Sequence, residues 1–289
     1  MGAADVVPGV SGGTIAFISG IYEELIDSIN NINFKAFVVW RKEGTPELWK
    51  HINGNFFFFL FAGIGISIFT LSKVVIYLLE AHPVLLWSFF FGLIIASVWL
   101  VGKSVKKWSP GTIISLIIGI AIAYWISSIQ TTASVDAKWY IVLSGAIAIC
   151  AMILPGISGA FILVLMGSYQ IVYGAIAGRD WIIIALFALG CAIGLLSFAR
   201  VLKFLFSRFR EITITLLTGF MIGSLTKVWP WKETISYRKD SHDELVPFIQ
   251  ENVLPGDYVG DAQMWFAIGC AVGGFLLIFI LERFAPKQK

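Results

Sequence analysis

Six apolar segments, each long enough to cross a lipid bilayer, are the feature that most restricts how this chain can fold. About 20 apolar residues in a helix span a hydrocarbon layer of roughly 30 Å. The chain of 289 residues is 58% hydrophobic and 13% charged, with a mean hydropathy of +0.85, which excludes an ordinary soluble domain. We therefore predict an all-α polytopic membrane protein. The predicted spans are 56–80, 84–102, 111–129, 181–206, 211–228 and 263–282.

A ten-residue motif, Asp5 to Thr14, recurs in altered form 147 residues later as Met152 to Phe161. Each copy contains Pro-Gly, which interrupts an apolar run, and then Ser-Gly, where a new helix can begin. Matching residues continue through the spans that follow each copy. We therefore predict two repeats, each a re-entrant helical hairpin followed by three spans. The first repeat covers 1–130 with its hairpin at 1–28, and the second covers 131–289 with its hairpin at 139–177.

The two copies differ in what precedes them. An apolar lead-in, Trp139 to Ala151, comes before the second motif, whereas only Met1 to Ala4 come before the first. Either the first hairpin has one arm fewer, or the natural N-terminus extends beyond Met1. We expect the second.

The positions of Lys and Arg favour hairpins that return to the side from which they entered. With such hairpins, three spans separate the motifs, and the repeats have inverted orientations in the membrane. Most Lys and Arg residues of the short loops then share a side with the C-terminus, and the positive-inside rule places that side in the cytoplasm. We predict a cytoplasmic loop at 29–55, or 27–55 with the end of the hairpin included, and an external loop at 229–262 with little regular structure. Residues 30–52 form either an amphipathic helix on the membrane surface or a folded loop.

The first motif combines hydroxyl groups with backbone N–H groups that suit the oxygens of a phosphate or carboxylate. The second motif offers fewer such groups, because Ala160 and Phe161 stand where the first copy has glycine and threonine. The alternative is that Pro-Gly and Ser-Gly only let the hairpins pack closely. The candidate anion-binding residues are Ser11, Gly12, Gly13 and Thr14 in the first copy and Ser158 and Gly159 in the second.

Charged residues within the apolar segments are further candidates. Lys73 and Arg200 are matched in the repeat, and in an inverted arrangement they would stand toward opposite membrane faces and compensate the charge of a passing anion. Arg200 could instead extend to the cytoplasmic surface. Asp5 and Glu23 are candidates for proton coupling, because an unpaired carboxylate at membrane depth is costly or takes up a proton. Asp5 could instead lie at the interface, paired with a cation or capping a helix.

Other kinds of site find no support in the sequence. The three cysteines lie in apolar segments without CxxC spacing, and the three histidines are scattered, so we expect no metal, cofactor or disulfide. The net charge of +3 is too small and dispersed to indicate nucleic-acid binding.

The stretch from Gly2 to Leu25, with its echo from Leu154 to Ala160, resembles the bacterial polyprenyl-phosphate transporter family (PopT), formerly a domain of unknown function. The resemblance covers nearly the whole chain. It implies a multi-pass flippase of the bacterial cytoplasmic membrane that returns undecaprenyl phosphate, the carrier lipid of cell-wall (peptidoglycan) synthesis, from the outer to the inner leaflet. The lipid and the membrane would be its partners, and a homodimer is a candidate assembly.

Two alternatives compete with transport of a lipid. Undecaprenyl-diphosphate phosphatases have a similar Pro-Gly-x-Ser element, but theirs continues with arginine and serine. Here glycine follows both Ser11 and Ser158, and no arginine or histidine stands beside either serine, so the activation that nucleophilic attack requires is missing. We therefore expect no enzyme activity. A transporter of another small anion is the second alternative.

Overall fold

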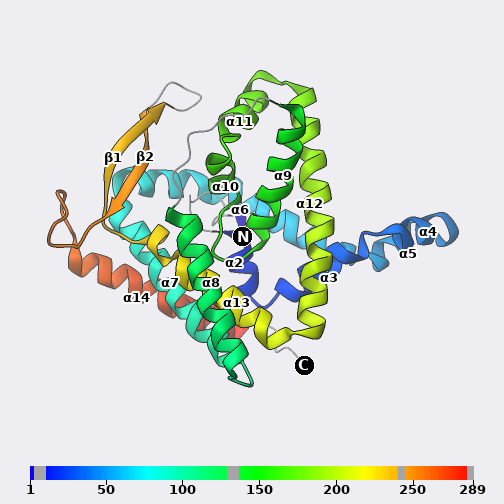
Figure 1. Cartoon of the computed structure of the whole chain (residues 1–289), viewed down its shortest axis with the longest axis horizontal. Helices are drawn as coiled ribbons and strands as arrows, with labels where there is room; N and C mark the ends of the chain where they lie inside the picture. Colours follow the sequence, from blue (N-terminus) through cyan, green and yellow to red (C-terminus); the bar gives the residue numbers. More distant parts are fainter. Residues whose placement is uncertain (3–10, 129–136, 240–244, 285–289) are drawn as a thin grey trace.

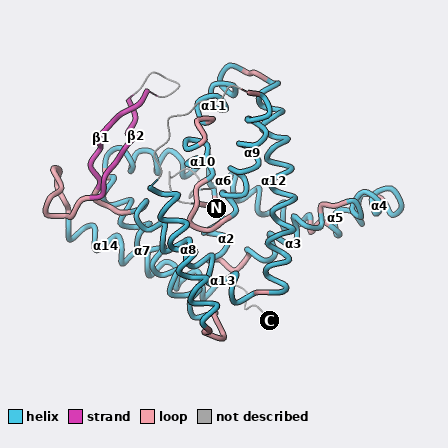
Figure 2. The backbone as a smooth tube through the Cα atoms, viewed as in Figure 1, coloured by secondary structure: helices cyan, strands magenta, loops and turns pink. Residues whose placement is uncertain are grey.

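A computed structural model of the chain describes residues 1–2, 11–128, 137–239 and 245–284. The described part is largely helical and carries one two-stranded sheet (Figures 1 and 2). The elements are α2 (Gly12–Ile18), α3 (Tyr22–Asn31), α4 (Phe34–Glu43), α5 (Thr45–His51), α6 (Gly54–Ala81), α7 (Pro83–Ser104), α8 (Pro110–Ser128), α9 (Lys138–Ile153), α10 (Gly159–Leu165), α11 (Tyr169–Gly178), α12 (Trp181–Arg208), α13 (Arg210–Gly223), the 3-10 helix η1 (Ser224–Val228), β1 (Lys232–Lys239), β2 (Leu245–Asn252) and α14 (Met264–Phe284).

The predicted span 211–228 coincides with α13 and the 3-10 helix η1, and each of the others coincides with a long α-helix, except that residue 129 lies outside the described residues. Among the described residues, five helical segments are long and apolar enough to cross a membrane, namely those in α6, α7, α8, α12 and the continuous α13–η1. The apolar parts of α9 and α14 are shorter. Pro83 and Pro110 stand in the first turns of α7 and α8, where proline is favoured because the N–H it lacks would have no partner. The chain is thus a mainly helical membrane protein.

The described parts of the two motifs fold alike. Each has a seven-residue helix, α2 or α10, followed by a turn and a ten-residue helix, α3 or α11. The turns contain Gly20 and Gly167, matched in the repeat, with φ of 75° and 66°. Glycine adopts these angles without steric cost. The same local structure therefore follows both Pro-Gly breaks, although the first break, with Asp5, lies outside the described residues.

The later helices of each half pack on those of the other half. The most extensive pairings are α8 with α13, α7 with α14, and α9 with α12. The first two join the halves, and glycines allow the close approach. A Cβ on Gly92 of α7 would collide with the carbonyl oxygen of Ala271, and one on Gly219 of α13, its match in the repeat, with that of Leu116. The two halves are therefore interlocked, while their inverted orientation in the membrane stays a prediction.

The segment 229–262 is more regular than predicted. Instead of a loop with little regular structure, β1 and β2 form an antiparallel pair in which Lys232 lies opposite Asn252 and Tyr237 opposite Pro247. Threonine, isoleucine and tyrosine in β1 favour a strand. Pro247 is tolerated because both strands of a two-stranded sheet are edges, where a missing N–H costs little. The prediction was wrong because it took acidic residues and prolines as signs of an irregular loop.

Residues 30–52 contain two short helices, α4 and α5, which project from one end of the molecule, while β1 and β2 lie at the opposite end (Figure 1). The segment is therefore helical, while its place on the membrane surface stays a prediction. Large aromatic side chains on these helices are exposed among basic residues. They are Phe34, Phe37, Trp40 and Trp49.

Candidate functional site

The two motifs contact each other directly. The hydroxyl of Ser11 donates a hydrogen bond of 2.7 Å to the carbonyl oxygen of Met152, and the backbone N–H of Gly156 donates one of 2.9 Å to the hydroxyl of Thr14. Ser11 and Thr14 are 2% and 1% exposed. We call this contact, made by residues 11–14 and 152–156, the motif junction. The sequence showed that the two segments are copies of one motif, and the structure shows that they contact each other.

Glycine at position 13 is what lets the junction close. A Cβ on Gly13 would collide with the carbonyl oxygen of Ile153 and would lie 2.8 Å from that of Met152. The backbone N–H of Gly13 donates to the hydroxyl of Ser11 at 3.1 Å, so this serine caps α2 as well as joining the two motifs. In this conformation the hydroxyl of Ser11 donates to the second motif, and the hydroxyl of Thr14 accepts from it.

The second motif is closed by packing as well. Ser158 caps α10 by accepting from the backbone N–H of Phe161 at 3.4 Å, and a Cβ on Gly159 would lie 2.7 Å from the carbonyl oxygen of Ala148. Gly156, with φ of 84°, lies against the carbonyl of Phe220, because a Cβ there would be 2.7 Å from that oxygen. Both motifs therefore also serve as close packing surfaces.

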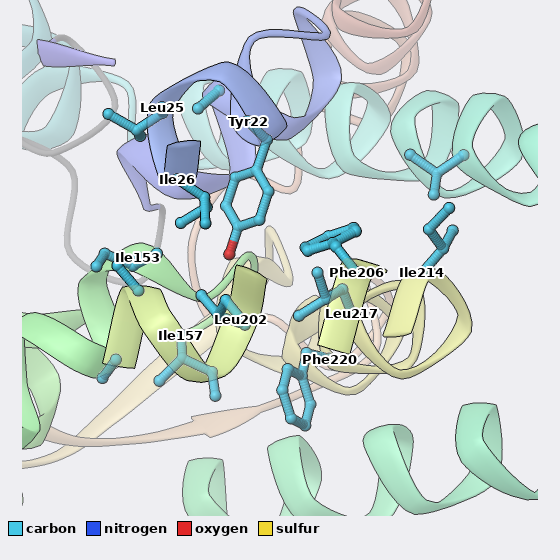
Figure 3. Close-up of a cluster of buried hydrophobic side chains, with 14 of the residues drawn as sticks. Tyr22, Leu25, Ile26, Ile153, Ile157, Leu202, Phe206, Ile214, Leu217 and Phe220 are labelled. Carbon is cyan, nitrogen blue, oxygen red and sulfur yellow. The ribbon is translucent and has the colours of Figure 1, made fainter. Parts of the chain in front are cut away.

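A buried apolar cluster lies beside the junction, between α3 and the helices α12 and α13 (Figure 3). Tyr22 is 1% exposed, and its ring contacts those of Phe17 and Phe206. Its hydroxyl points toward Leu202 and Ile157 (Figure 3) and has no hydrogen-bond partner in the described part of the chain. A buried hydroxyl without a partner is costly, so the Tyr22 hydroxyl lowers the stability of the observed conformation.

Two lysines that the sequence analysis did not single out lie on the other side of the second motif. The ammonium of Lys227, in η1, stands 4.2 Å from the centre of the Phe161 ring. The ammonium of Lys232 stands 3.8 Å from the centre of the Trp87 ring and donates to the carbonyl oxygen of Lys227. Burial lowers the pKa of Lys232 to about 7, and the nearby charge of Lys227 adds to the shift. We call these residues the lysine pair.

The two cations predicted from the repeat lie elsewhere. Lys73 on α6 and Arg200 on α12 are both exposed. Neither takes part in an ion pair among the described residues, and no hydrogen bond joins either of them to the motif junction. Their role in compensating an anion stays a prediction.

Glu23, a candidate coupling residue, is paired. Its carboxylate accepts from the guanidinium of Arg210 at 2.5 Å, and one turn further along α3 Asp27 pairs with Lys203 at 2.9 Å. Both pairs join α3 of the first half to α12 or α13 of the second half, and both are about half exposed. Protonation of Glu23 would weaken one of the two links.

A groove of about 650 Å³ lies between α2–α3 and the start of α6. One end of its lining is polar, where the side-chain amide of Asn53 donates to Glu24 at 2.9 Å, and the rest is mainly apolar. Such a lining suits an amphiphilic molecule better than a small ion. The polar residues are Ser19, Glu24, Asn53 and Asn55, and the apolar ones include Ile15, Phe56, Phe59, Leu60 and Ile64.

Comparison with known proteins shows which family this chain belongs to. The sequence model of the undecaprenyl phosphate translocase-like family matches residues 1–246. The chain belongs to this family. A polyprenyl-phosphate transporter of Vibrio cholerae serotype O1 is 46% identical over 291 residues, which cover 99% of this chain and 94% of the relative. A polyprenyl-phosphate transporter of Staphylococcus aureus is 33% identical over 252 residues, covering 80% of this chain and 83% of the relative. No solved structure matches.

Membership of the translocase-like family helps to decide whether the chain is an enzyme. The family and both relatives are named for transport rather than catalysis, which confirms the expectation that the chain is not an enzyme. The junction agrees with this result, because the hydroxyls of Ser11 and Thr14 bond to backbone groups rather than to a base. Among the described residues, no group of three His, Cys, Asp or Glu side chains could hold a metal ion.

Proposed function

We propose that this chain is a flippase for undecaprenyl phosphate or a closely related polyprenyl phosphate in the bacterial cytoplasmic membrane. It returns the carrier lipid from the outer to the inner leaflet for reuse in cell-wall synthesis. The names of the two relatives support the lipid class. The structural observation that supports this proposal most is the motif junction, where two hydroxyls of the first motif bond to backbone groups of the second and Gly13 lies against the second motif.

The chemistry of the lipid explains why a polar junction inside a membrane protein is useful. A phosphate headgroup carries nearly two negative charges and cannot cross hydrocarbon unaided, whereas a polyprenyl tail can stay in the bilayer. The protein therefore needs a polar path for the headgroup and an opening to the lipid for the tail. The groove beside α6, with its polar end and apolar wall, fits the second requirement.

In the proposed mechanism the halves move against each other, and the junction opens to each side in turn. Opening frees the hydroxyls of Ser11, Thr14 and Ser158. It also exposes the backbone N–H groups of the glycines beside them, and together these groups bind the phosphate oxygens. Lys73 and Arg200 compensate the charge nearer the two membrane faces. The glycine set is Gly12, Gly13 and Gly159.

Proton coupling is proposed for Glu23, with Asp5 as the second candidate. Glu23 holds α3 to α13 through Arg210, so its protonation would loosen the observed conformation. A headgroup phosphate could then replace the carboxylate beside the guanidinium, because arginine binds both groups with the same geometry. A proton gradient would thereby give transport a direction.

Reconstitution of the purified full chain in liposomes tests the proposal. We expect transfer of polyprenyl phosphate between leaflets, and we expect Ser11→Ala combined with Lys73→Ala to slow it by about tenfold or more. Thr70→Val is the matched control, because the Thr70 hydroxyl is exposed and donates only to the carbonyl of Ile66 in its own helix. No transfer by the wild-type chain, or an unchanged rate in the double variant, would contradict the proposal.

The same preparation separates the two alternatives. A phosphatase would release inorganic phosphate from polyprenyl diphosphate. A carrier of small anions would be inhibited by soluble anions without moving lipid. We expect neither result.

A further inference from the structure

The lysine pair lies where η1 leads into β1. The carbonyl oxygen of Lys227 accepts from the ammonium of Lys232, and an aromatic ring lies against each ammonium. Lys232 is held in place from several sides, since the indole N–H groups of Trp229 and Trp231 anchor the base of the hairpin to the carbonyls of Val253 and Ala262.

Neither lysine has an acidic partner in the described part of the chain. The three ion pairs there involve other residues. Glu233, next to Lys232 in β1, accepts instead from the backbone N–H of Val259, and Glu251, opposite Glu233 in the register, is exposed. Two like charges withdrawn from water without a counter-ion are unfavourable. Such a cluster is typical of a site that an anion completes.

The pair also adjoins the second motif. Phe161, the ring beneath Lys227, is the residue that stands where the first motif has Thr14. Gly156 at the junction lies close to η1, because a Cβ there would be 2.9 Å from the hydroxyl of Ser224. A ligand held by the lysine pair is therefore next to the segment that closes the junction.

We propose that the lysine pair is a binding site for a phosphate monoester, at the hairpin end of the molecule. Two ammonium groups match the charge of nearly −2 that a phosphate monoester carries at neutral pH. Their N–H bonds, apart from the one that Lys232 donates to the carbonyl of Lys227, are available for its terminal oxygens. Resting on the proposed function, the ligand is the headgroup of polyprenyl phosphate. With the predicted sidedness, this end faces outward, where the lipid to be returned is loaded.

The site predicts a pH dependence of binding. The pKa of Lys232 is about 7, so this side chain loses its charge as the pH rises above that value, whereas a phosphate monoester gains its second charge near pH 6. Among the side chains that the structure describes, the charged groups near Lys232 are Lys227 from η1 and Glu233 and Glu251 from the hairpin, while α7 and α10 contribute the rings of Trp87 and Phe161. Phosphate affinity should therefore fall between about pH 7 and about pH 9.

Equilibrium binding to the purified full chain in detergent tests the proposal, with farnesyl phosphate and inorganic phosphate as probes. We expect Lys227→Gln and Lys232→Gln each to weaken binding by about tenfold or more. Lys103→Gln is the matched control, because Lys103 is exposed and also stands over an aromatic ring, that of Trp99. Lys232→Arg should keep the binding and remove its loss between about pH 7 and about pH 9, because arginine stays charged.

The two probes distinguish the source of the phosphate. Binding of farnesyl phosphate with little competition from inorganic phosphate identifies a lipid headgroup site, and equal binding of both identifies a general phosphate site, which still supports the proposal. Wild-type affinity in both glutamine variants would overturn it, as would a pH dependence that persists in Lys232→Arg. If lysine-dependent binding occurs but reconstituted protein moves no lipid, the proposed function fails while this site stands.

Discussion

Gly13 is consistent with both interpretations of the repeated motif, as an anion-binding site and as a close packing surface. Its missing side chain lets α2 reach the carbonyls at the end of α9, and the same lack of bulk would let a phosphate approach the backbone once the junction opens. One residue can therefore serve two conformations. A change that blocks closing should be visible in stability as well as in transport.

We predict that Gly13→Ala destabilises the closed junction. The added methyl group would collide with the carbonyl oxygen of Ile153, and such overpacking costs about 1–3 kcal/mol. Thermal unfolding in detergent should show a lower midpoint than in the wild type. Gly63→Ala is the control, because a Cβ there meets nothing within 4 Å, so its midpoint should be unchanged or higher. Equal midpoints for the two variants would contradict the closed junction.

We predict that Tyr22→Phe stabilises the protein. The hydroxyl of Tyr22 is buried without a partner in the described chain, and such a group costs about 1–3 kcal/mol. Tyr140→Phe provides the contrast, since its hydroxyl donates to the carbonyl of Met166 at 2.9 Å, and its loss should destabilise by about 1 kcal/mol. Denaturant titration of both variants measures the difference. A loss of stability in Tyr22→Phe would mean that its hydroxyl is satisfied.

The sequence identified single residues unevenly. Ser11, Gly13 and Thr14 were singled out because polar and small residues interrupt an apolar run. The lysine pair was missed, because Lys227 ends an apolar span and Lys232 begins a polar segment. Their proximity depends on how η1 leads into β1, and the spacing of residues in the sequence does not predict such a contact. Lys73, by contrast, was conspicuous in sequence and is exposed in the structure.

At the scale of elements, α3 is a link between the halves that carries two ion pairs. It belongs to the first motif but contacts α12, to which Asp27 holds it through Lys203, and Glu23 ties it to Arg210 at the start of α13. Half-exposed ion pairs of this kind contribute about 0–1 kcal/mol each. That is little for stability but enough to shift an equilibrium between two conformations of similar free energy.

We predict that Glu23→Gln changes stability by less than about 1 kcal/mol but alters coupling. The amide keeps the shape of the side chain and cannot take up a proton, so transport in liposomes should lose its dependence on an imposed pH gradient. Glu47→Gln is the control, because Glu47 pairs only with Lys50 within the exposed α5. If the gradient still drives Glu23→Gln as it drives the wild type, Glu23 is not the coupling group.

The long helices, which hydrophobicity determines, were predicted from the sequence. The strand pair β1–β2, which depends on backbone hydrogen bonding, was not. The long helices follow from apolar runs, because unpaired backbone groups are too costly in hydrocarbon for any other structure. The β1–β2 hairpin lies in a polar segment. Charged residues on exposed faces do not prevent strands from pairing, so their abundance in 229–262 was not a sign of irregular structure.

At the scale of the whole molecule, α4–α5 and β1–β2 mark opposite ends (Figure 1), which fits their predicted placement on opposite sides of the membrane. The positive-inside rule assigns α4–α5 to the cytoplasm. The spatial arrangement of the ends comes from the structure, whereas the direction in the membrane is still a prediction from charge.

We predict that a cysteine in α4 reacts only from the cytoplasm and one in β1 only from outside. Phe37 and Ile235 are exposed and suit substitution by cysteine, after Cys150, Cys191 and Cys270 have been replaced. Labelling of whole cells with a membrane-impermeant maleimide should modify Ile235→Cys alone, and labelling of inverted vesicles Phe37→Cys alone. The reverse pattern would invert the topology, and labelling of both from one side would refute the placement.

The pairing of α7 with α14 and of α8 with α13 has a consequence for how such a chain could arise. Neither half by itself provides these partners for α7, α8, α13 and α14, so a half-length polypeptide could form the same pairings only with a second copy of itself. If two identical short chains formed a dimer through these pairings, fusion of their genes would keep the same contact surfaces. Fusion would then free the copies to diverge. Of the matched positions, Thr14 has a hydroxyl in the first motif, whereas Phe161 in the second has an aromatic ring beneath Lys227.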